Sequence, residues 1–281
     1  MIIMQIIGGL GNQMFQYALG RHLAILNKTE LKLDVTTFDT YKLHNYSLNH
    51  FNVQENFATS KEINRLKTSK VMKKLGLIKP SHIIEKDQVF SEEILQLRGD
   101  FYLESYWQTE KYFQDIEEII KHDFQVKTEL SGQNKESANQ IATVDAVSVH
   151  VRRGDYVANP ETLKIHGLCG QEYYARAVSE IVEKVSKPNF FVFSDDPAWA
   201  KDNLIFNYPT FYLDHNQADK NYEDLRLMNL CKHNIIANSS FSWWGAWLNN
   251  NPVKIVVAPA KWYSDPTKNI QNIVPESWLK I

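Results

Sequence analysis

The sequence predicts an α/β protein made of two Rossmann-like halves, and three observations support that class. Residues 2–34 read as a strand, a glycine turn, a helix and a second strand, which is how a nucleotide-binding fold begins. From residue 189 to residue 258, strand-like apolar runs alternate with helix-like ones, a pattern typical of a parallel sheet. Between these regions, residues 147–156 read as a strand that ends in charged residues, because valines alternate there with polar positions.

The composition is that of a folded globular protein. The chain has 281 residues, 43% of them hydrophobic and 23% charged, which is enough for two modest domains. The formal net charge is −2, with 31 Lys and Arg against 33 Asp and Glu, so nothing favours a nucleic-acid partner or a polybasic membrane tether. Only Cys169 and Cys231 occur, which excludes a disulfide framework and a cysteine-based metal site and fits a reducing compartment.

The N-terminal residues Met1–Ile7 are apolar but too short for a secretory signal core, and no basic leader or small-residue cleavage pattern accompanies them. No stretch of about 20 apolar residues predicts a membrane-spanning helix. We therefore expect a cytoplasmic protein without a transmembrane segment, and a peripheral contact with the membrane stays open.

Two domains are expected, residues 1–140 and residues 141–281. The boundary falls in Lys127–Thr143, which is rich in Ser, Asn, Gln and Glu and reads as a linker. The elements expected in the first domain are strands at 2–7, 30–34 and 99–107 and helices at 12–26, 61–74 and 110–124. Those expected in the second are strands at 147–151, 189–193, 210–213, 234–237 and 254–258, helices at 174–185, 222–232 and 239–248, a helix start at Pro197, and a loop at 157–170.

The glycine turn Gly8-Gly-Leu-Gly11 admits a rival reading as a dinucleotide site, with Asp34 in the place of the ribose-binding acid. That fingerprint breaks at its third glycine, because the bulk of Met14 opposes close packing of the helix on the strand. The turn keeps backbone N–H groups at a helix start and the amides of Asn12 and Gln13, which can meet anions or sugar hydroxyls. A plain helix start capped by Asn12 is the alternative.

The richest polar cluster follows the strand at 147–151. His150, Arg152, Arg153 and Asp155 lie within six residues of one another, and open α/β sheets hold their ligands at the carboxyl ends of strands. Two fork-shaped guanidinium groups beside a carboxylate suit a phosphate. A strand followed by a solvated charged turn is the alternative without a functional role.

Three segments of the chain resemble a known enzyme family. His150-Val-Arg-Arg-Gly-Asp-Tyr156 resembles the motif shared by α1,2- and α1,6-fucosyltransferases and protein O-fucosyltransferases. Gly8-Gly-Leu-Gly-Asn-Gln-Met-Phe-Gln-Tyr-Ala18 and Asn238-Ser-Ser-Phe-Ser-Trp-Trp-Gly-Ala-Trp-Leu248 are similar to segments of family-11 glycosyltransferases, the bacterial and animal α1,2-fucosyltransferases. The resemblance implies a GT-B-type fold, in which two Rossmann-like domains face one another across a cleft. The first would be the acceptor side, and the second would bind the GDP-sugar.

The resemblance also implies a reaction, the inverting transfer of L-fucose from GDP-fucose to the 2-hydroxyl of a terminal β-galactoside. The acceptor would be a galactose-terminated oligosaccharide or a lipid-linked glycan, in cell-surface glycan or O-antigen synthesis. Animal members carry an N-terminal anchor that this chain lacks, which points to a bacterial cytoplasmic enzyme. A non-catalytic GDP-sugar-binding protein and an NAD-linked oxidoreductase stay open as alternatives.

Two residues are expected to act on the reacting atoms. Arg152 would neutralise the charge that grows on the β-phosphate of the departing GDP, as the first arginine of this motif does in related fucosyltransferases. Asp155 would take the proton of the acceptor hydroxyl, although it can equally orient an arginine. Glu161 and Glu172 are the reserve bases.

The donor phosphates have further expected partners. Ser239 and Ser240 stand just before a helix, so their hydroxyls and the backbone N–H of Phe241 can bind phosphate, whereas simple N-capping is the alternative. Arg153 adds a second guanidinium group. The tryptophans that follow are read mainly as packing that seats this helix.

The guanine base is expected to meet His150 and Asp224. Asp224 matches a guanine-contacting acid of α1,6-fucosyltransferases by position, and a solvated helix acid is the alternative for it. By resemblance, Asn12 would face the donor. No metal and no other cofactor are expected, because Asp195-Asp196 lacks the spacer of the Asp-x-Asp motif of metal-dependent transferases and arginines are present for the diphosphate.

Overall fold

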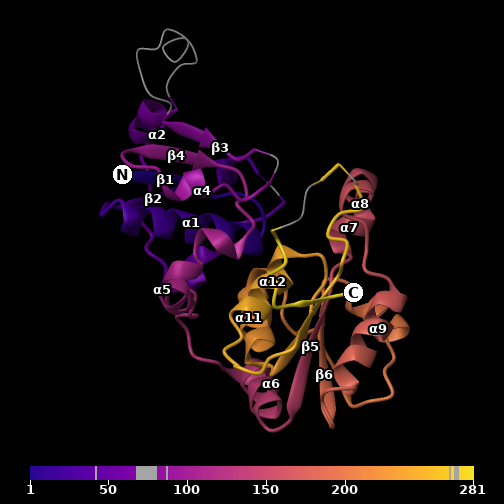
Figure 1. The fold of residues 1–281 in the computed structure, drawn as a ribbon. Coiled ribbons are helices and arrows are strands. Elements are labelled where there is room, and N and C mark those ends of the chain that lie inside the picture. The colour runs from indigo at the N-terminus through magenta and orange to yellow at the C-terminus, as the bar shows by residue number, and fades with distance from the viewer. Residues whose placement is uncertain (42, 68–80, 87, 266, 269–271) are drawn as a thin grey trace. The chain divides into compact units, whose positions relative to one another are not determined.

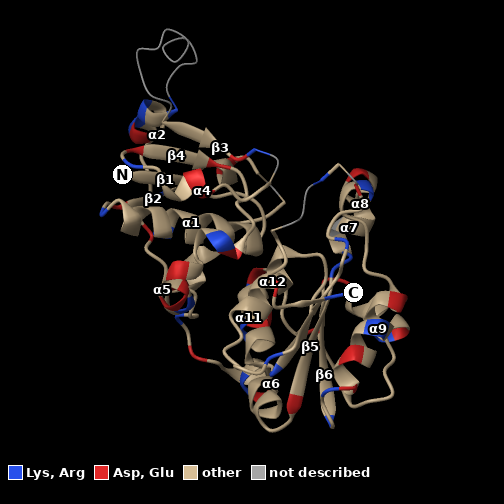
Figure 2. Cartoon of the chain, in the orientation of Figure 1, with Lys and Arg blue, Asp and Glu red and all other residues tan. Residues whose placement is uncertain are grey.

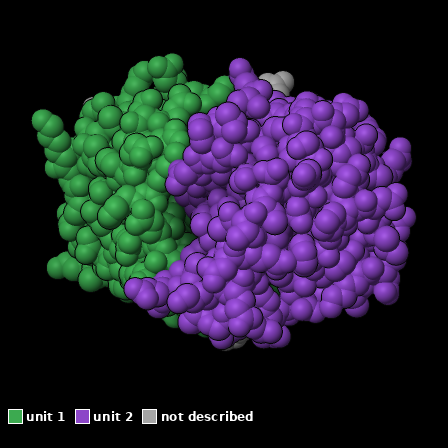
Figure 3. Space-filling view, turned by 90° about the horizontal axis from the view of Figure 1, so that it is seen from below, with its two compact units in different colours: residues 1–127, 269–273 green, residues 128–268, 274–281 purple. Residues whose placement is uncertain are grey.

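The computed structural model describes residues 1–41, 43–67, 81–86, 88–265, 267–268 and 272–281, apart from the Asp155 side chain. The chain forms two compact units, which Figure 3 colours separately. Unit 1 comprises Met1–Lys127 with Asn269–Ile273, and unit 2 comprises Thr128–Lys268 with Val274–Ile281. The division lies at 127/128, earlier than the expected 140/141.

Unit 1 is built on a parallel sheet with the strand order β2-β1-β4-β3 (Figure 1). Its strands are β1 (Ile2–Gln5), β2 (Leu31–Asp34), β3 (His82–Ile84) and β4 (Phe101–Glu104). Its helices are α1 (Leu10–Leu26), α2 (Ser60–Leu66), α4 (Glu92–Leu95) and α5 (Glu117–Asp123), with 3₁₀ turns η1 (Thr36–Asp39), η2 (Leu48–His50), η3 (Glu110–Tyr112) and η4 (Gln114–Ile116). The single helix expected at 110–124 is therefore wrong, since two 3₁₀ turns precede α5. Of the helix expected at 61–74, residues 68–74 lie outside the described part of the chain.

Helix α1 packs tightly against the unit 1 sheet at a glycine that the fingerprint did not point to. A Cβ atom at Gly20 would lie 2.8 Å from Cδ1 of Leu31 and 3.2 Å from Cβ of Met4, so the glycine lets the helix approach β1 and β2 without displacing these side chains. Met14 is fully buried six residues earlier. Helix α1 therefore does pack closely on the sheet, but the close contact lies at Gly20 and not at Met14, the third position of the fingerprint.

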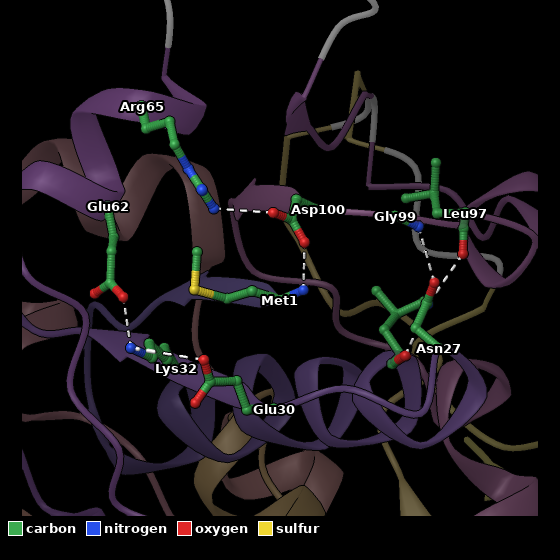
Figure 4. Close-up of polar contacts among 10 residues, drawn as sticks. Met1, Asn27, Glu30, Lys32, Glu62, Arg65, Leu97, Gly99 and Asp100 are labelled. Carbon is green, nitrogen blue, oxygen red and sulfur yellow. Dashed lines mark hydrogen bonds and ion pairs between the residues drawn. The ribbon is translucent and has the colours of Figure 1, made fainter.

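The amino ends of the unit 1 strands are closed by charged and amide groups (Figure 4). The amino group of Met1 pairs with Asp100, and Arg65 pairs with the second oxygen of the same carboxylate at 2.9 Å. On β2, Lys32 donates to Glu62 at 2.6 Å. Surface pairs of this kind add little stability each. Their position leaves the opposite, carboxyl edge of the sheet for the glycine turn.

Unit 2 has a six-stranded parallel sheet with the order β10-β9-β8-β5-β6-β7, the order of a dinucleotide-binding Rossmann fold. Its strands are β5 (Asp145–Val151), β6 (Pro188–Ser194), β7 (Thr210–Leu213), β8 (His233–Ile235), β9 (Val256–Ala258) and β10 (Leu279–Lys280). Its helices are α6 (Gly132–Ala142), α7 (Gly154–Ala158), α8 (Pro160–His166), α9 (Gln171–Val182), α10 (Pro197–Asn203), α11 (Asn221–Leu230) and α12 (Ser240–Trp247), with a 3₁₀ turn η5 (Ala218–Lys220). The five strands expected for this half are confirmed.

Both faces of the unit 2 sheet are buried. On one face Val147, Val149 and Val151 pack with apolar residues of α9 and α10. On the other, Phe191 and Phe193 pack with residues of α6 and α11. Burial on both faces explains why these strands are apolar throughout.

Two expectations for unit 2 are wrong. The linker expected at Lys127–Thr143 contains α6, which buries Ile141 against the sheet and so belongs to unit 2. The loop expected at 157–170 contains the last two residues of α7 and all of α8. Helix α8 starts where Asn159 accepts hydrogen bonds from two backbone N–H groups and Pro160 takes the first helical position.

Charged residues of both signs are interspersed along both units (Figure 2), in keeping with a formal net charge of −2. None of the described helices combines the length and the apolar composition that a membrane-spanning segment requires.

Candidate active site

The polar cluster that the sequence predicts around His150, Arg152 and Arg153 lies at the point where the strand order of unit 2 reverses. Strand β5 pairs with β6 on one side and with β8 on the other, and the chain moves outward from β5 in both directions. A crevice opens between such strands at their carboxyl ends, where α/β proteins hold their ligands. Arg152 follows β5 and Ser239 follows β8, so both residues lie at this switch point.

The guanidinium group of Arg152 is partly exposed and paired. Its Nη1 lies 2.8 Å from Oδ2 of Asp195, and the two side chains are 24% and 26% exposed. The guanidinium carbon lies 5.4 Å from the centre of the Tyr156 ring, within reach of a cation–π interaction. The hydroxyl of Tyr156 in turn donates to the backbone oxygen of Asn238 at 3.2 Å. Arg152 is thus linked to the segment that starts α12.

Arg153 has a different environment from Arg152. Its guanidinium carbon lies 3.9 Å from the centre of the Trp199 ring, and its Nε lies 3.3 Å from Oδ2 of Asp196. Asp196 also caps α10 by accepting from the backbone N–H of Trp199, as expected for a helix that starts at Pro197. The side chain of Arg153 is therefore engaged in holding α10.

His150 is a buried residue of β5 whose ring lies 5.5 Å from the ring of Phe241 in α12. Burial lowers its pKa to about 4, so the imidazole is neutral at pH 7. Within the described part of the chain, its Nδ1 has no hydrogen-bond partner. A buried polar atom without a partner calls for an explanation, and a ligand that reaches the switch point supplies one.

Helix α12 begins at the switch point with the capping predicted from its sequence. The hydroxyl of Ser239 accepts a hydrogen bond from the backbone N–H of Phe241 at 3.3 Å, so that N–H is already engaged by the cap. Ser240 occupies the first turn and is half-buried. The partial positive charge of the helix start lies on the same edge as Arg152 and favours an anion there.

Asn238, immediately before this helix, binds two other chain segments. Its Nδ2 donates to the backbone oxygens of His166 at 2.8 Å and Trp262 at 3.1 Å. The start of α12 is therefore fixed to the end of α8. The tryptophans of α12 are core residues as expected: Trp243 and Trp244 are fully buried, and Trp247 stacks on Trp243.

Asp224, on α11, is not the solvated helix acid of the alternative reading. Its Oδ1 accepts a hydrogen bond from Nδ2 of Asn216 at 2.7 Å. Asn216 exchanges two further amide hydrogen bonds with Asn134 of α6, and His215 contacts the same Asn134 side chain at 2.8 Å. Burial, followed by the nearby Glu223, raises the pKa of Asp224 to about 7 although the Asn216 hydrogen bond lowers it.

Of the residues proposed as proton acceptors, the structure describes the side chains of Glu161 and Glu172. Asp155 belongs to α7, and its side chain lies outside the described part of the chain. Glu161 is exposed in the first turn of α8, and Glu172 is exposed in the first turn of α9. Within the described ranges, no group of three or more His, Cys, Asp or Glu side chains is arranged to hold a metal ion.

Of the two amides expected at the glycine turn of unit 1, that of Gln13 is buried and donates to the backbone oxygens of Gly8 and Asn45, so it is not presented to a ligand. Asn12 does not cap α1, because the cap position is Gly9 and carries no side-chain hydrogen bond. Instead, Oδ1 of Asn12 accepts from Nε2 of Gln108 at 2.7 Å. Asp34, the acid of the dinucleotide reading, is buried with its oxygens bound by Thr36 and by the hydroxyl of Tyr102 at 2.7 Å. It is therefore not presented to a ribose.

Two residues that bind predicted site residues were missed from the sequence, Asp195 beside Arg152 at the switch point and Asn216 beside Asp224. From the sequence, Asp195 is considered only as part of an incomplete metal motif. The available signal was topological, because consecutive strands of a parallel sheet are often neighbours and charged residues follow both β5 and β6. For Asn216 the sequence offers no signal, since it lies in a polar stretch without a motif.

A Rossmann-type sheet whose switch point carries an arginine, a buried histidine and a helix start defines a class of α/β protein that binds an anionic nucleotide ligand. Comparison with known proteins gives the family. The model of "Glycosyl transferase family 11" matches residues 1–281. An alpha-1,2-colitosyltransferase of Escherichia coli is 35% identical over 289 residues, covering 100% of this chain and 98% of that protein.

Further relatives are also glycosyltransferases. The O-antigen biosynthesis glycosyltransferase WbnK of Escherichia coli is 33% identical and covers 98% of both chains. The human galactoside alpha-(1,2)-fucosyltransferase 1 is 30% identical over 170 residues, covering 56% of this chain and 46% of that protein. Among solved structures, FUT1 of Arabidopsis thaliana has a TM-score of 0.54 at 13% identity, covering 99% of this chain and 75% of its own. Fucosyltransferase NodZ from Bradyrhizobium has a TM-score of 0.50 at 13% identity, covering 87% and 91%.

The chain belongs to glycosyl transferase family 11. It is a glycosyltransferase, which uses a nucleotide-sugar donor and a glycan acceptor. The parallel units and the likeness to solved fucosyltransferases confirm the expected α/β fold of the GT-B type. The resemblance stated from three sequence segments is confirmed over the whole chain.

Proposed function

We propose that this glycosyltransferase moves L-fucose from GDP-fucose to the 2-hydroxyl of a terminal β-galactoside with inversion at the anomeric carbon. The observation that carries the proposal is the position of Arg152 at the switch point of unit 2, next to the start of α12. A departing GDP gains negative charge on its β-phosphate. A guanidinium fork and a helix start on one sheet edge stabilise such charge more strongly as it develops.

The guanine assignment is supported by the chemistry of Asp224. An ionised carboxylate accepts the two neighbouring N–H groups on one edge of guanine, whereas adenine offers no such pair of donors. Oδ1 of Asp224 is oriented by Asn216, and the network through Asn134 holds that amide in place. Asp224 is thus a fixed acceptor on the unit that we assign to the donor, and His150 contributes an unpartnered buried nitrogen there, as far as the structure describes the chain.

A second donor is favoured by the relative that is named an alpha-1,2-colitosyltransferase. Colitose is L-fucose without its 3-hydroxyl group, so the two donors share the nucleotide, the ring and the transferred anomeric carbon. GDP-colitose is therefore the competing donor for this chain. Discrimination between the two depends on whether a polar group of the protein requires the 3-hydroxyl, because a site built for a hydroxyl rejects an analogue that lacks it.

We further propose a role in O-antigen or other cell-surface glycan synthesis, supported by the named function of the WbnK relative. The acceptor in that setting is a galactose-terminated oligosaccharide or a lipid-linked glycan. We propose that the enzyme acts without a required metal or other cofactor and in the cytoplasm, in peripheral contact with the membrane when its acceptor is lipid-linked. Arg152 and the helix start supply the positive charge that a metal ion supplies in other transferases.

The test is an assay of GDP release with GDP-fucose and GDP-colitose against lactose, N-acetyllactosamine and the type 1 and type 3 disaccharides. Product linkage is read by NMR, and lactose lacking the 2-hydroxyl of its galactose is the matched control acceptor. We expect transfer to the 2-hydroxyl and no product with the control. Binding of GDP without turnover on any glycan would instead establish a GDP-sugar-binding protein, and a fluorescence response to NADH would revive the oxidoreductase alternative.

A further inference from the structure

Asp195 is not assigned a role by the family resemblance, yet it pairs directly with the proposed catalytic arginine. It follows β6, at the same edge of the sheet as the end of β5. We infer that Asp195 is a positioning residue that sets the orientation of the Arg152 guanidinium group for the diphosphate of the donor. The inference rests on the proposed function, in which Arg152 meets that diphosphate.

Both oxygens of the Asp195 carboxylate are bound by consecutive residues of the central motif. Oδ2 lies 2.8 Å from Nη1 of Arg152, and Oδ1 accepts the backbone N–H of Arg153 at 2.7 Å. One carboxylate thus fixes the side chain of the first arginine relative to the backbone of the second. A guanidinium group is planar, so directing one nitrogen to Asp195 fixes the plane in which its other N–H groups point.

The glycine of the motif provides independent support. A Cβ atom at Gly154 would lie 2.9 Å from Oδ2 of Asp195 and 3.1 Å from its Cγ. These distances are too short for ordinary carbon contacts, and the backbone of Gly154 has no left-handed conformation that would otherwise require glycine. The missing side chain at residue 154 therefore leaves space for the Asp195 carboxylate.

Asp195 itself is held rigidly. Val151 and Ser194 are paired in the parallel β5–β6 ladder, so the residues that follow them leave the sheet side by side. On the other flank, the backbone N–H of Asp196 donates to the hydroxyl of Ser194 at 2.9 Å, and the Asp196 side chain caps α10. Because the residues on both sides of Asp195 are fixed, its carboxylate can hold the flexible side chain of Arg152 in one orientation. That side chain then loses little further conformational freedom when the donor binds.

The experiment is a double-mutant cycle of Asp195→Asn and Arg152→Lys, read by turnover and by GDP affinity from calorimetry. Asparagine keeps an oxygen for the N–H of Arg153 but removes the charge that Arg152 faces. In the wild-type background we expect kcat to fall by at least about tenfold and GDP affinity to fall with it, since misplacement of a catalytic group is costly. In the Arg152→Lys background the same substitution should change both quantities by less than about twofold.

An equal loss in both backgrounds, or no loss in either, would overturn the inference. The matched control is Asp145→Asn, which removes a carboxylate that pairs with Lys232 at 2.7 Å. Asp145 lies at the amino end of β5, opposite to the end that Arg152 follows, so turnover and GDP affinity should stay at wild-type values. Should Asp195→Asn lower the thermal midpoint so far that it cannot be assayed, Gly154→Ala displaces the same carboxylate by a different route. It should reproduce the loss of kcat, and a Gly154→Ala enzyme with wild-type turnover would overturn the inference as well.

The GDP affinities measured in the cycle distinguish a failure of this inference from a failure of the proposed function. If no sugar is transferred from either donor, the proposed reaction fails while the calorimetric cycle still reports whether Asp195 acts through Arg152. If transfer proceeds and the cycle is additive, the reaction stands and the positioning role of Asp195 does not.

Discussion

Asn216 donates a hydrogen bond to the carboxylate of Asp224 at 2.7 Å, yet burial outweighs this contact and raises the pKa of Asp224 to about 7. The acid is therefore half-protonated under ordinary assay conditions. Only the ionised form accepts two N–H groups, so under the proposed contact of Asp224 with guanine we expect the affinity for the donor to depend on pH.

The first prediction is that GDP affinity rises as the pH increases from 6 to 8. Asp224 passes from about one-tenth to about nine-tenths ionised over this interval, so affinity should increase by about tenfold. Titration calorimetry at several pH values measures it. The phosphates of GDP also titrate in this range, so Asp224→Asn is the control, and its pH dependence should be the weaker one. Parallel curves for both proteins would remove Asp224 from the base-binding site.

The second prediction concerns stability, and its sign follows from the direction of the same shift. The pKa of Asp224 is higher in the folded protein than its ordinary value of 3.8, so the folded state holds the proton more tightly. The stabilisation of the folded state that comes from this bound proton is present below pH 4 and is lost as the pH rises through 7. Asp224→Asn should therefore raise the thermal midpoint by a few degrees at pH 8 and by less at pH 4, measured by calorimetric scans. A midpoint that drops at pH 8 would contradict it.

The third prediction is that Arg152→Lys lowers the rate by about 10²-fold or more, mostly in kcat, because lysine keeps the charge and loses the planar fork. Folding should be intact, as judged by circular dichroism. Arg176→Lys, on the exposed side of α9, is the matched control and should be neutral. Near-wild-type turnover by Arg152→Lys would show that the fork does not act on the diphosphate.

The fourth prediction tests the base. Asp155→Asn removes the acceptor of the proton and keeps the size of the side chain, so turnover should collapse while GDP affinity changes little. Loss of affinity together with rate would indicate instead that Asp155 orients an arginine, because ground state and transition state would then suffer alike. Calorimetry and turnover on the same protein separate the two roles. Wild-type turnover would direct the search to Glu161 and Glu172.

The fifth prediction is that activity survives EDTA. Arg152 and the start of α12 are proposed to neutralise the departing diphosphate, so chelation should leave the rate within about twofold of its starting value. Divalent ions can still raise the rate by binding the released GDP. An enzyme that EDTA abolishes and Mn²⁺ restores would refute the proposed arginine mechanism.

The fold was predictable where periodicity is strong. The strands β5, β6 and β7 and the helices α9, α11 and α12 were predicted because their apolar residues recur at strand or helix spacing over several turns or pleats. Strands β3 and β10 were missed because three and two residues are too few to show a period. Helix α6 was taken for a linker because Ser, Asn and Gln dominate its exposed face, and it buries little beyond Ile141.

The site was predictable only where its residues are neighbours in sequence. His150, Arg152 and Arg153 are three of four consecutive positions, and Ser239 opens a helix with a recognisable cap. Asp195 lies 42 positions beyond Arg153 in the chain, and it reaches the site only because β6 pairs with β5 in register. The Asn134–Asn216 contact spans 82 positions, between segments without a motif. Such contacts are set by sheet topology and helix placement, which no local pattern encodes.

The sequence makeup of unit 1 limits how the enzyme can be re-engineered. Unit 1 includes residues near the C-terminus as well as Met1–Lys127, and the chain then returns to unit 2 to supply β10. Exchanging unit 1 between family members therefore requires a graft at two separated places in the gene, because a single crossover at residue 127 would combine a foreign N-terminal part of unit 1 with its native C-terminal segment. A library of chimeras with one junction should yield fewer folded proteins than a library in which both segments are exchanged together.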